Sequence, residues 1–152
     1  MAYRKSDQHL LISLTDRFSK IHRMCGRFEL TTKYEKLPTL LKKQPPKGLQ
    51  QNYVQQEFIR PTDPILVLKN EGKTSTSIML WGFISEWTKD PFDRKKPKPF
   101  NARAETIKEK KIFRESWRHK RCLIPASGFF EKDYRISRKD DQPFWLGGLW
   151  NR

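Results

Sequence analysis

The sequence has 152 residues, which is enough for one domain with a hydrophobic core. Its hydrophobic content is 36% and its mean hydropathy −0.85, but an aromatic content of 12% argues against a disordered chain. The 32 lysine and arginine residues exceed the 17 aspartate and glutamate residues, and the formal charge of +15 favours a polyanionic partner such as nucleic acid over a merely solubilising surface.

No apolar run approaches the roughly 20 residues needed to cross a bilayer. Two cysteines do not make a disulfide framework, which favours a cytoplasmic protein. Residues 1–23 are expected to form an N-terminal extension, and the stretch "HLLISL" in it is too short and interrupted for a signal peptide. Apolar side chains recur there at near-helical spacing: Leu10, Leu11, Leu14, Phe18 and Ile21.

The first elements after this extension are a strand and a helix. "GRFEL" at 26–30 alternates as a strand does, and "TTKYEKLPTLLKK" at 31–43 is typical of a helix after a threonine cap. Pro38 inside such a helix would cost ~3 kcal/mol, so we expect a break or two short pieces. "QPPKGLQQ" at 44–51 is expected to be a loop.

The second half of the chain is expected to consist mainly of strands. Residues 64–84 predict a hairpin around an Asn-Glu-Gly-Lys turn, and the basic, proline-rich residues 89–100 predict a connector outside any sheet. A helix with a basic face, a buried strand leading into a turn, and a last apolar strand follow at 104–120, 121–131 and 142–150. These elements predict an α+β fold, mostly antiparallel β with a few short helices.

Cys25, in "MCGRF", is the first candidate for chemistry. A lone cysteine is usually a small buried hydrophobe. Here Arg27 could favour the thiolate, and Gly26 would let a ligand approach the backbone closely. We expect no metal site, because Cys25 has no metal-ligand spacing with the other cysteine or with the isolated histidines: Cys122, His22 and His119.

"PFNARAET" at 99–106 is the second candidate. On an extended segment its alternation would place Asn101, Arg103 and Glu105 on one face. An amide, a guanidinium and a carboxylate together suit phosphate and sugar recognition. The alternative is an ordinary solvated strand edge.

Two aromatic stretches complete the set. "IPASGFFE" at 124–131 places Glu131 beside phenylalanines, where a carboxylate could perform acid/base work; the alternative is a surface glutamate. "LWGFISEW" at 80–87 places Trp81 and Trp87 around Gly82, and such rings either stack on unpaired bases or belong to the core.

The ordered combination of five stretches resembles the SRAP family (SOS response-associated peptidase). These stretches are "MCGRF" at 24–28, "RPTDP" at 60–64, "LWGFISEW" at 80–87, "FNARAET" at 100–106 and "RCLIPASGFFE" at 121–131. The resemblance implies a partial SRAP domain at 24–152 with an incomplete C-terminal part, because the active-site histidine of the family lies downstream of this sequence. His119 precedes "RCLIP" and is not its equivalent.

The resemblance also implies a mechanism. In this family the initiator methionine is removed, and the exposed cysteine attacks the ring-opened aldehyde of an abasic site in single-stranded DNA. Carried over, Cys25 is the nucleophile, Asn101 orients the opened sugar and Glu131 is the acid/base carboxylate. A free α-amine, with an intrinsic pKa of about 8, forms a Schiff base, and the neighbouring thiol closes a thiazolidine ring.

The same resemblance implies the binding residues and the cellular setting. Arg27 and Arg103 would hold flanking phosphates, while Trp81 and Gly82 would lie against the DNA. The partner would be single-stranded DNA containing abasic sites, bound in the DNA-damage (SOS) response by a nucleoid-associated, cytoplasmic monomer without cofactor or metal. The family label adds self-processing peptidase (hydrolase) activity and lyase-like chemistry.

This chemistry requires a free amine on Cys25. We therefore expect either translation from Met24 with removal of that methionine, or cleavage of the extension. The alternatives are noncovalent binding of single-stranded DNA and an inactive truncated remnant. A cysteine protease acting on other proteins ranks lower, because the sequence offers Cys25 no histidine partner.

Overall fold

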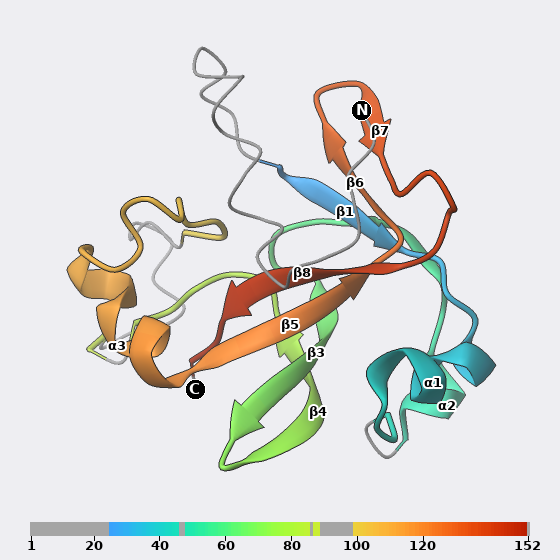
Figure 1. Ribbon diagram of the computed structural model, residues 1–152, viewed down its shortest axis with the longest axis horizontal. Helices are drawn as coiled ribbons and strands as arrows, with labels where there is room; N and C mark the ends of the chain where they lie inside the picture. Colours follow the sequence, from blue (N-terminus) through green and yellow to red (C-terminus); the bar gives the residue numbers. More distant parts are fainter. Residues whose placement is uncertain (1–24, 46–47, 86, 89–98, 152) are drawn as a thin grey trace.

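The computed structural model describes residues 25–45, 48–85, 87–88 and 99–151 (Figure 1). Within this part of the chain, eight strands form two four-stranded antiparallel sheets, ordered β2-β1-β6-β7 and β4-β3-β5-β8. The predicted α+β class with mostly antiparallel strands is confirmed. The predicted extension at 1–23 and most of the predicted connector at 89–100 lie outside the described residues.

The first sheet contains β1 (Arg27–Leu30), β2 (Gln56–Ile59), β6 (Gly128–Glu131) and β7 (Tyr134–Ile136). The second contains β3 (Pro64–Glu71), β4 (Lys73–Leu80), β5 (Arg121–Ala126) and β8 (Phe144–Leu149). The hairpin predicted at 64–84 is confirmed as β3 and β4, which turn at Gly72, a residue with a φ of 72°. The last apolar strand is confirmed as β8.

The helices are short. The break expected at Pro38 is confirmed: a 3-10 helix, η1 (Tyr34–Lys36), passes into α1 (Leu37–Leu41), and the proline falls in the first turn of α1, where its missing N–H is tolerated. The loop predicted at 44–51 is wrong at its end, because α2 (Leu49–Asn52) begins after Gly48. Gly48 has a φ of 81°, a conformation that glycine adopts readily.

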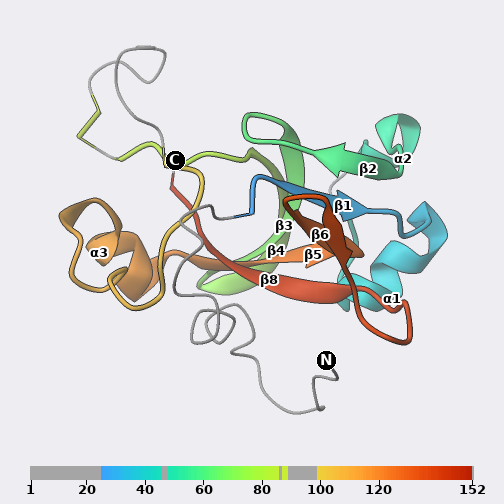
Figure 2. The same ribbon diagram turned by 90° about the horizontal axis from the view of Figure 1, so that it is seen from above.

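The helix predicted at 104–120 is shorter than expected. Only α3 (Lys111–His119) forms, and residues 104–109 make turns. The extended backbone of Lys110 separates the two parts, and the carbonyl of Lys110 accepts the first hydrogen bonds of the helix, from Phe113 and Arg114. Figures 1 and 2 both place α3 at one end of the molecule, with α1 and α2 at the other.

One of the crossings between the two sheets is made by a single residue. The strand and turn predicted at 121–131 prove to be two strands, β5 and β6, joined by Ser127. The Ser127 N–H donates to the Glu29 carbonyl at 2.8 Å, and its Oγ accepts from the Thr31 N–H at 3.0 Å. These bonds to β1 and the residue after it fix the crossing, so that β6 pairs with β1 while β5 stays in the other sheet.

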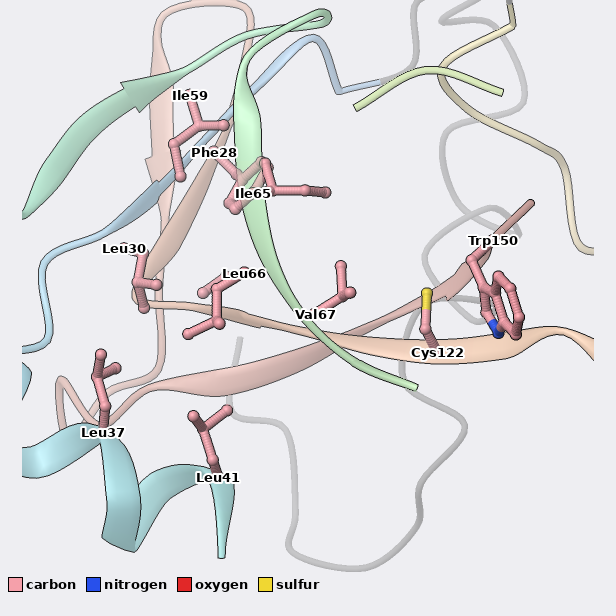
Figure 3. Packing of buried hydrophobic residues seen from close by; sticks show 11 residues of the cluster. Phe28, Leu30, Leu37, Leu41, Ile59, Ile65, Leu66, Val67, Cys122 and Trp150 are labelled. Atoms are coloured by element: carbon pink, nitrogen blue, oxygen red, sulfur yellow. The ribbon is translucent and has the colours of Figure 1, made fainter. Parts of the chain in front are cut away.

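The core draws side chains from both sheets and from α1 (Figure 3). β1 and β2 contribute Phe28, Leu30 and Ile59, and the first half of β3 contributes a continuous apolar run. Leu37 and Leu41 close one end of this cluster, and Trp150 lies beside Cys122 at the other (Figure 3). Burial of these side chains removes apolar surface from water, which contributes roughly 25 cal/mol per Å² to the free energy of folding and stabilises β1 in this position.

Replacing Gly128 with alanine is expected to destabilise the fold by about 1–3 kcal/mol, because an added Cβ would overpack this position. That Cβ would lie 2.9 Å from Glu29 Oε1 and 3.3 Å from the Ile136 carbonyl oxygen. Glu29 is buried and accepts two hydrogen bonds from Arg135, at 2.6 and 2.9 Å, so its carboxylate cannot move without breaking them. The urea midpoint measures the effect. Gly26→Ala, which adds a Cβ in open space, is the control; equal midpoints for the two variants would contradict this packing.

Candidate functional site

Cys25 lies two residues before Arg27, the first residue of β1, and is partly buried. Its Sγ donates to the Arg27 carbonyl at 2.9 Å. Burial raises the pKa of the Cys25 thiol above its ordinary value of 9.0, although backbone hydrogen bonds with Arg27 and Phe130 act in the opposite direction. As expected, the charge of Arg27 favours the thiolate by lowering the pKa of the thiol. Desolvation is the larger effect, so the pKa is raised overall.

Asn101 binds the backbone of the same cysteine. Its Nδ2 donates to the Cys25 carbonyl across 76 residues of sequence. The segment that carries Asn101 is held in turn by Trp81 and Phe83. Trp81 Nε1 donates to the Phe100 carbonyl at 2.7 Å, and the Phe83 N–H donates to the Pro99 carbonyl at 2.8 Å.

Trp81 itself is half-buried between two phenylalanines. Its ring makes edge contacts with Phe28 at 5.2 Å and with Phe100 at 5.9 Å, measured between ring centroids. Trp81 therefore links the core to the segment that bears Asn101. Its contact with DNA stays a prediction, as does that of Gly82, which is exposed at a φ of 154°.

Glu131 reaches the same region from β6. Arg27 pairs with Phe130 in the sheet register, which brings the end of β6 beside the start of β1. The Glu131 carboxylate is near enough to add, by its negative charge, to the rise in the pKa of the Cys25 thiol. The other two residues predicted to be catalytic, Asn101 and Glu131, thus lie near Cys25, although the three come from separate parts of the sequence.

Arg27 lies on an aromatic pair that the sequence analysis missed. Phe58 of β2 and Phe130 of β6 stack at 5.7 Å, and the Arg27 guanidinium carbon lies 5.9 and 5.0 Å from their ring centroids. Arg27 Nη2 also donates to the Lys132 carbonyl at 3.2 Å. Since β2 was not expected as a strand, no sequence signal indicated that Phe58 would lie next to this arginine.

The face predicted for "PFNARAET" is only partly formed. Residues 101–103 are irregular rather than a strand, and Arg103 is exposed. Glu105 does not share this segment, because the chain turns after Arg103, whose carbonyl accepts the Thr106 N–H at 3.2 Å. Asn101 and Arg103 therefore remain site candidates. The alternation of an extended strand, which was expected to put Glu105 on the same face, does not continue to that residue.

His119 lies on α3, away from these contacts. It is exposed, and its Nε2 is 3.5 Å from Glu115 Oε1. Among the described residues, no group of three or more histidine, cysteine, aspartate or glutamate side chains has the arrangement of a metal site. The helices in this part of the chain are also too short and too polar to span a membrane.

The two cysteines are expected to differ sharply in their reaction with iodoacetamide. Burial raises the pKa of the Cys122 thiol to about 12, and this side chain is in the core, so it should stay unmodified in the folded chain. The raised pKa of the half-buried Cys25 predicts slow alkylation near pH 7.5, with a rate that still increases at pH 9. Peptide mass spectrometry of samples alkylated across this range measures both rates. An alkylation rate of Cys25 that levels off below pH 8 would show that the thiolate is stabilised, and would contradict the raised pKa of this thiol.

The comparisons with solved structures define the class of fold. A crystal structure from Bordetella bronchiseptica superposes with a TM-score of 0.67 at 22% identity, over 84% of this chain and 64% of that one. A structure from Bacteroides thetaiotaomicron gives 0.65 at 25% identity, over 82% and 59%. The two-sheet architecture is therefore one that experimental structures already contain.

The family model for SOS response associated peptidase (SRAP) matches residues 24–152, and the chain belongs to this family. It is 38% identical over 141 residues to the abasic site processing protein YoaM of Bacillus subtilis, covering 85% of this chain and 60% of that protein. It is 26% identical over 137 residues to YedK of Escherichia coli, covering 83% and 59%. The chain thus spans about 60% of the length of these curated relatives.

Proposed function

We propose that the chain takes part in abasic-site processing, and that it does so by binding single-stranded DNA and forming a covalent thiazolidine through Cys25. One observation carries the proposal: two candidate residues act on the same cysteine. Asn101 donates a hydrogen bond to the Cys25 carbonyl, and the charge of Glu131 acts on the Cys25 thiol. Relatives that span 85% of this chain are named abasic site processing proteins, which supports the same substrate.

The chemistry begins at the α-amine of Cys25. Because burial keeps the thiol protonated near neutral pH, the amine attacks the C1′ aldehyde of the opened sugar first. The carbinolamine loses its hydroxyl as water to give an iminium ion, whose nitrogen keeps its hydrogen. The sulfur then bonds to the same carbon, as the thiol gives up its proton to a base, so that the sequence from aldehyde and amine to thiazolidine releases one water overall.

Glu131 and Asn101 have distinct roles in this sequence. Glu131 donates the proton that leaves with the hydroxyl of the carbinolamine and accepts the proton of the thiol as the ring closes. Asn101 holds the carbonyl of Cys25 by a hydrogen bond. This bond restricts the orientation of Cys25, so that its amine and its sulfur can reach the same carbon of the sugar. Arg27, two residues after Cys25, and Arg103, two residues after Asn101, would bind the flanking phosphates.

A denaturing gel tests the proposal directly. Protein produced from Met24, with that methionine removed, is incubated with a single-stranded oligonucleotide that contains one abasic site. A band that combines protein and DNA and survives denaturation is expected, and the same oligonucleotide without the abasic site should give none. Noncovalent binding alone would leave two separate bands, which would refute covalent processing.

Glu131→Gln is expected to slow the formation of this adduct by about 100-fold, the low end of the usual contribution of acid/base catalysis. The same change removes a negative charge that raises the pKa of the Cys25 thiol, so alkylation of Cys25 should become faster. Single-turnover gels and iodoacetamide kinetics measure the two effects. If both rates fell together, the variant would have damaged the site, and the acid/base role would not follow.

A further inference from the structure

The solvent-facing side of α3 carries a row of cations. Lys111, Arg114 and Arg118 are exposed and stand at spacings of three and four residues, which places them along one side of the helix. The stretch from 108 to 121 contains seven lysine or arginine residues against two glutamates, and one of these, Glu115, lies 3.5 Å from His119. This row is termed the α3 cationic face below.

Two tryptophans border the α3 cationic face. Trp87 is 55% exposed, and Lys111 Nζ lies 5.8 Å from its ring centroid. Trp117 is half-buried and lies on α3 itself, three residues after Arg114, which makes the two side chains neighbours on the helix surface. A tryptophan as exposed as Trp87 leaves most of its apolar surface in water, so its ring is available to stack on a flat partner.

Folding does not use this face. α3 is attached through its other side, where Phe113 is buried and makes an edge contact with Phe83 at 5.2 Å between centroids. Lys120, by contrast, belongs to the folded body: its Nζ donates to Asn151 and lies over the Trp150 ring. The cations of the α3 face are therefore not needed to hold the helix in place.

The face is also separate from the Cys25 site. The contacts of Cys25 come from β1, β6 and the segment around residue 101, whereas α3 packs against β5 and β8. In Figures 1 and 2, α3 protrudes at the end of the molecule opposite α1 and α2.

We propose that the α3 cationic face, with Trp87 and Trp117, is a second binding surface for single-stranded nucleic acid. The cations would contact successive phosphates, and unpaired bases would stack on the tryptophan rings. Stacking favours a single strand over a duplex, whose bases are already stacked. This inference rests on the proposed function in one respect, which is that the polyanion bound by the face is a nucleic acid. It adds a second contact with that nucleic acid, away from Cys25.

The test uses the full chain and an unmodified, fluorescein-labelled oligothymidylate of about 15 nucleotides, within the site sizes of single-strand binding proteins. Anisotropy gives the affinity between about 50 and 200 mM KCl. The variant Lys111→Gln/Arg114→Gln/Arg118→Gln should reduce the slope of log K against log[KCl] by about 2, since each lost phosphate contact contributes about 0.7 for a single strand. The matched control, Lys33→Gln/Lys36→Gln/Lys43→Gln, removes the same charge near α1 and should leave the slope unchanged.

Trp87→Ala should weaken binding by fivefold or more, from about 1 kcal/mol of stacking, without changing the salt slope. Tyr134→Ala, at an aromatic residue that is 75% exposed on β7, is the control. Three results would each overturn the proposal. They are an equal reduction of the salt slope in the two triple variants, no effect of Trp87→Ala on affinity, and tighter binding of a duplex of the same length. Because this oligonucleotide has no abasic site, failure here is distinct from failure of the covalent chemistry, which the denaturing gel reports. Circular dichroism melts confirm that each variant is folded.

Discussion

Cys25→Ser is expected to abolish the denaturation-resistant adduct with abasic single-stranded DNA. The α-amine remains and can still form an imine, but a serine hydroxyl is a far weaker nucleophile than a thiol, so the stable five-membered ring does not form. The loss should exceed about 100-fold in adduct yield, comparable to removing one catalytic group. Denaturing gels run after fixed incubation times measure it.

Cys122→Ala is the matched control for this prediction, because it removes the only other thiol in the sequence. Cys122 is buried between β3 and β8, and burial raises the pKa of its thiol to about 12, so it takes no part in the proposed chemistry. The variant should retain the adduct, although lost core packing lowers its stability by about 1 kcal/mol. If Cys25→Ser kept the adduct and Cys122→Ala lost it, the nucleophile would have been assigned to the wrong cysteine.

The second large effect concerns the amine of Cys25. Protein that begins at Met1 is expected to form no stable adduct, because its Cys25 nitrogen is an amide and cannot form an imine. Protein produced from Met24 with the methionine removed should form it. The pair of proteins is compared on the same denaturing gel, and intact mass confirms where each chain begins.

A third protein separates the need for an amine from the need for the thiol beside it. One glycine inserted before Cys25 supplies an α-amine but moves it away from the thiol-bearing residue. This protein should give an adduct only when borohydride traps the imine. A stable adduct without borohydride, from either this protein or the chain that begins at Met1, would refute ring closure at an N-terminal cysteine.

The sequence was most informative where local pattern and chemistry coincide. The β3–β4 hairpin was predictable because two apolar runs flank a glycine turn, and Pro38 correctly indicated two short pieces. Cys25, Asn101 and Glu131 were chosen as residue types in a recognisable order, and the structure brings them together.

The remaining features depend on tertiary packing. β2 and β7 have few buried side chains, so no hydrophobic period marks them. The rise in the pKa of the Cys25 thiol arises from burial, which a charge count over neighbouring residues cannot supply. Likewise, the stacking of Phe58 on Phe130 beneath Arg27 follows from the pairing of β1 with β2 and β6, and neither β2 nor β6 was predicted as a separate strand.

The mass of the adduct distinguishes ring closure at Cys25 from simple addition and from noncovalent binding. Protein that begins at Cys25 is incubated with the abasic oligonucleotide, denatured and measured intact by electrospray mass spectrometry. Thiazolidine formation predicts the sum of the protein and oligonucleotide masses minus one water, and no such species from Cys25→Ser without reduction. A mass equal to the full sum would indicate simple addition of the thiol to the aldehyde, and two separate masses would indicate noncovalent binding; either result would contradict the account.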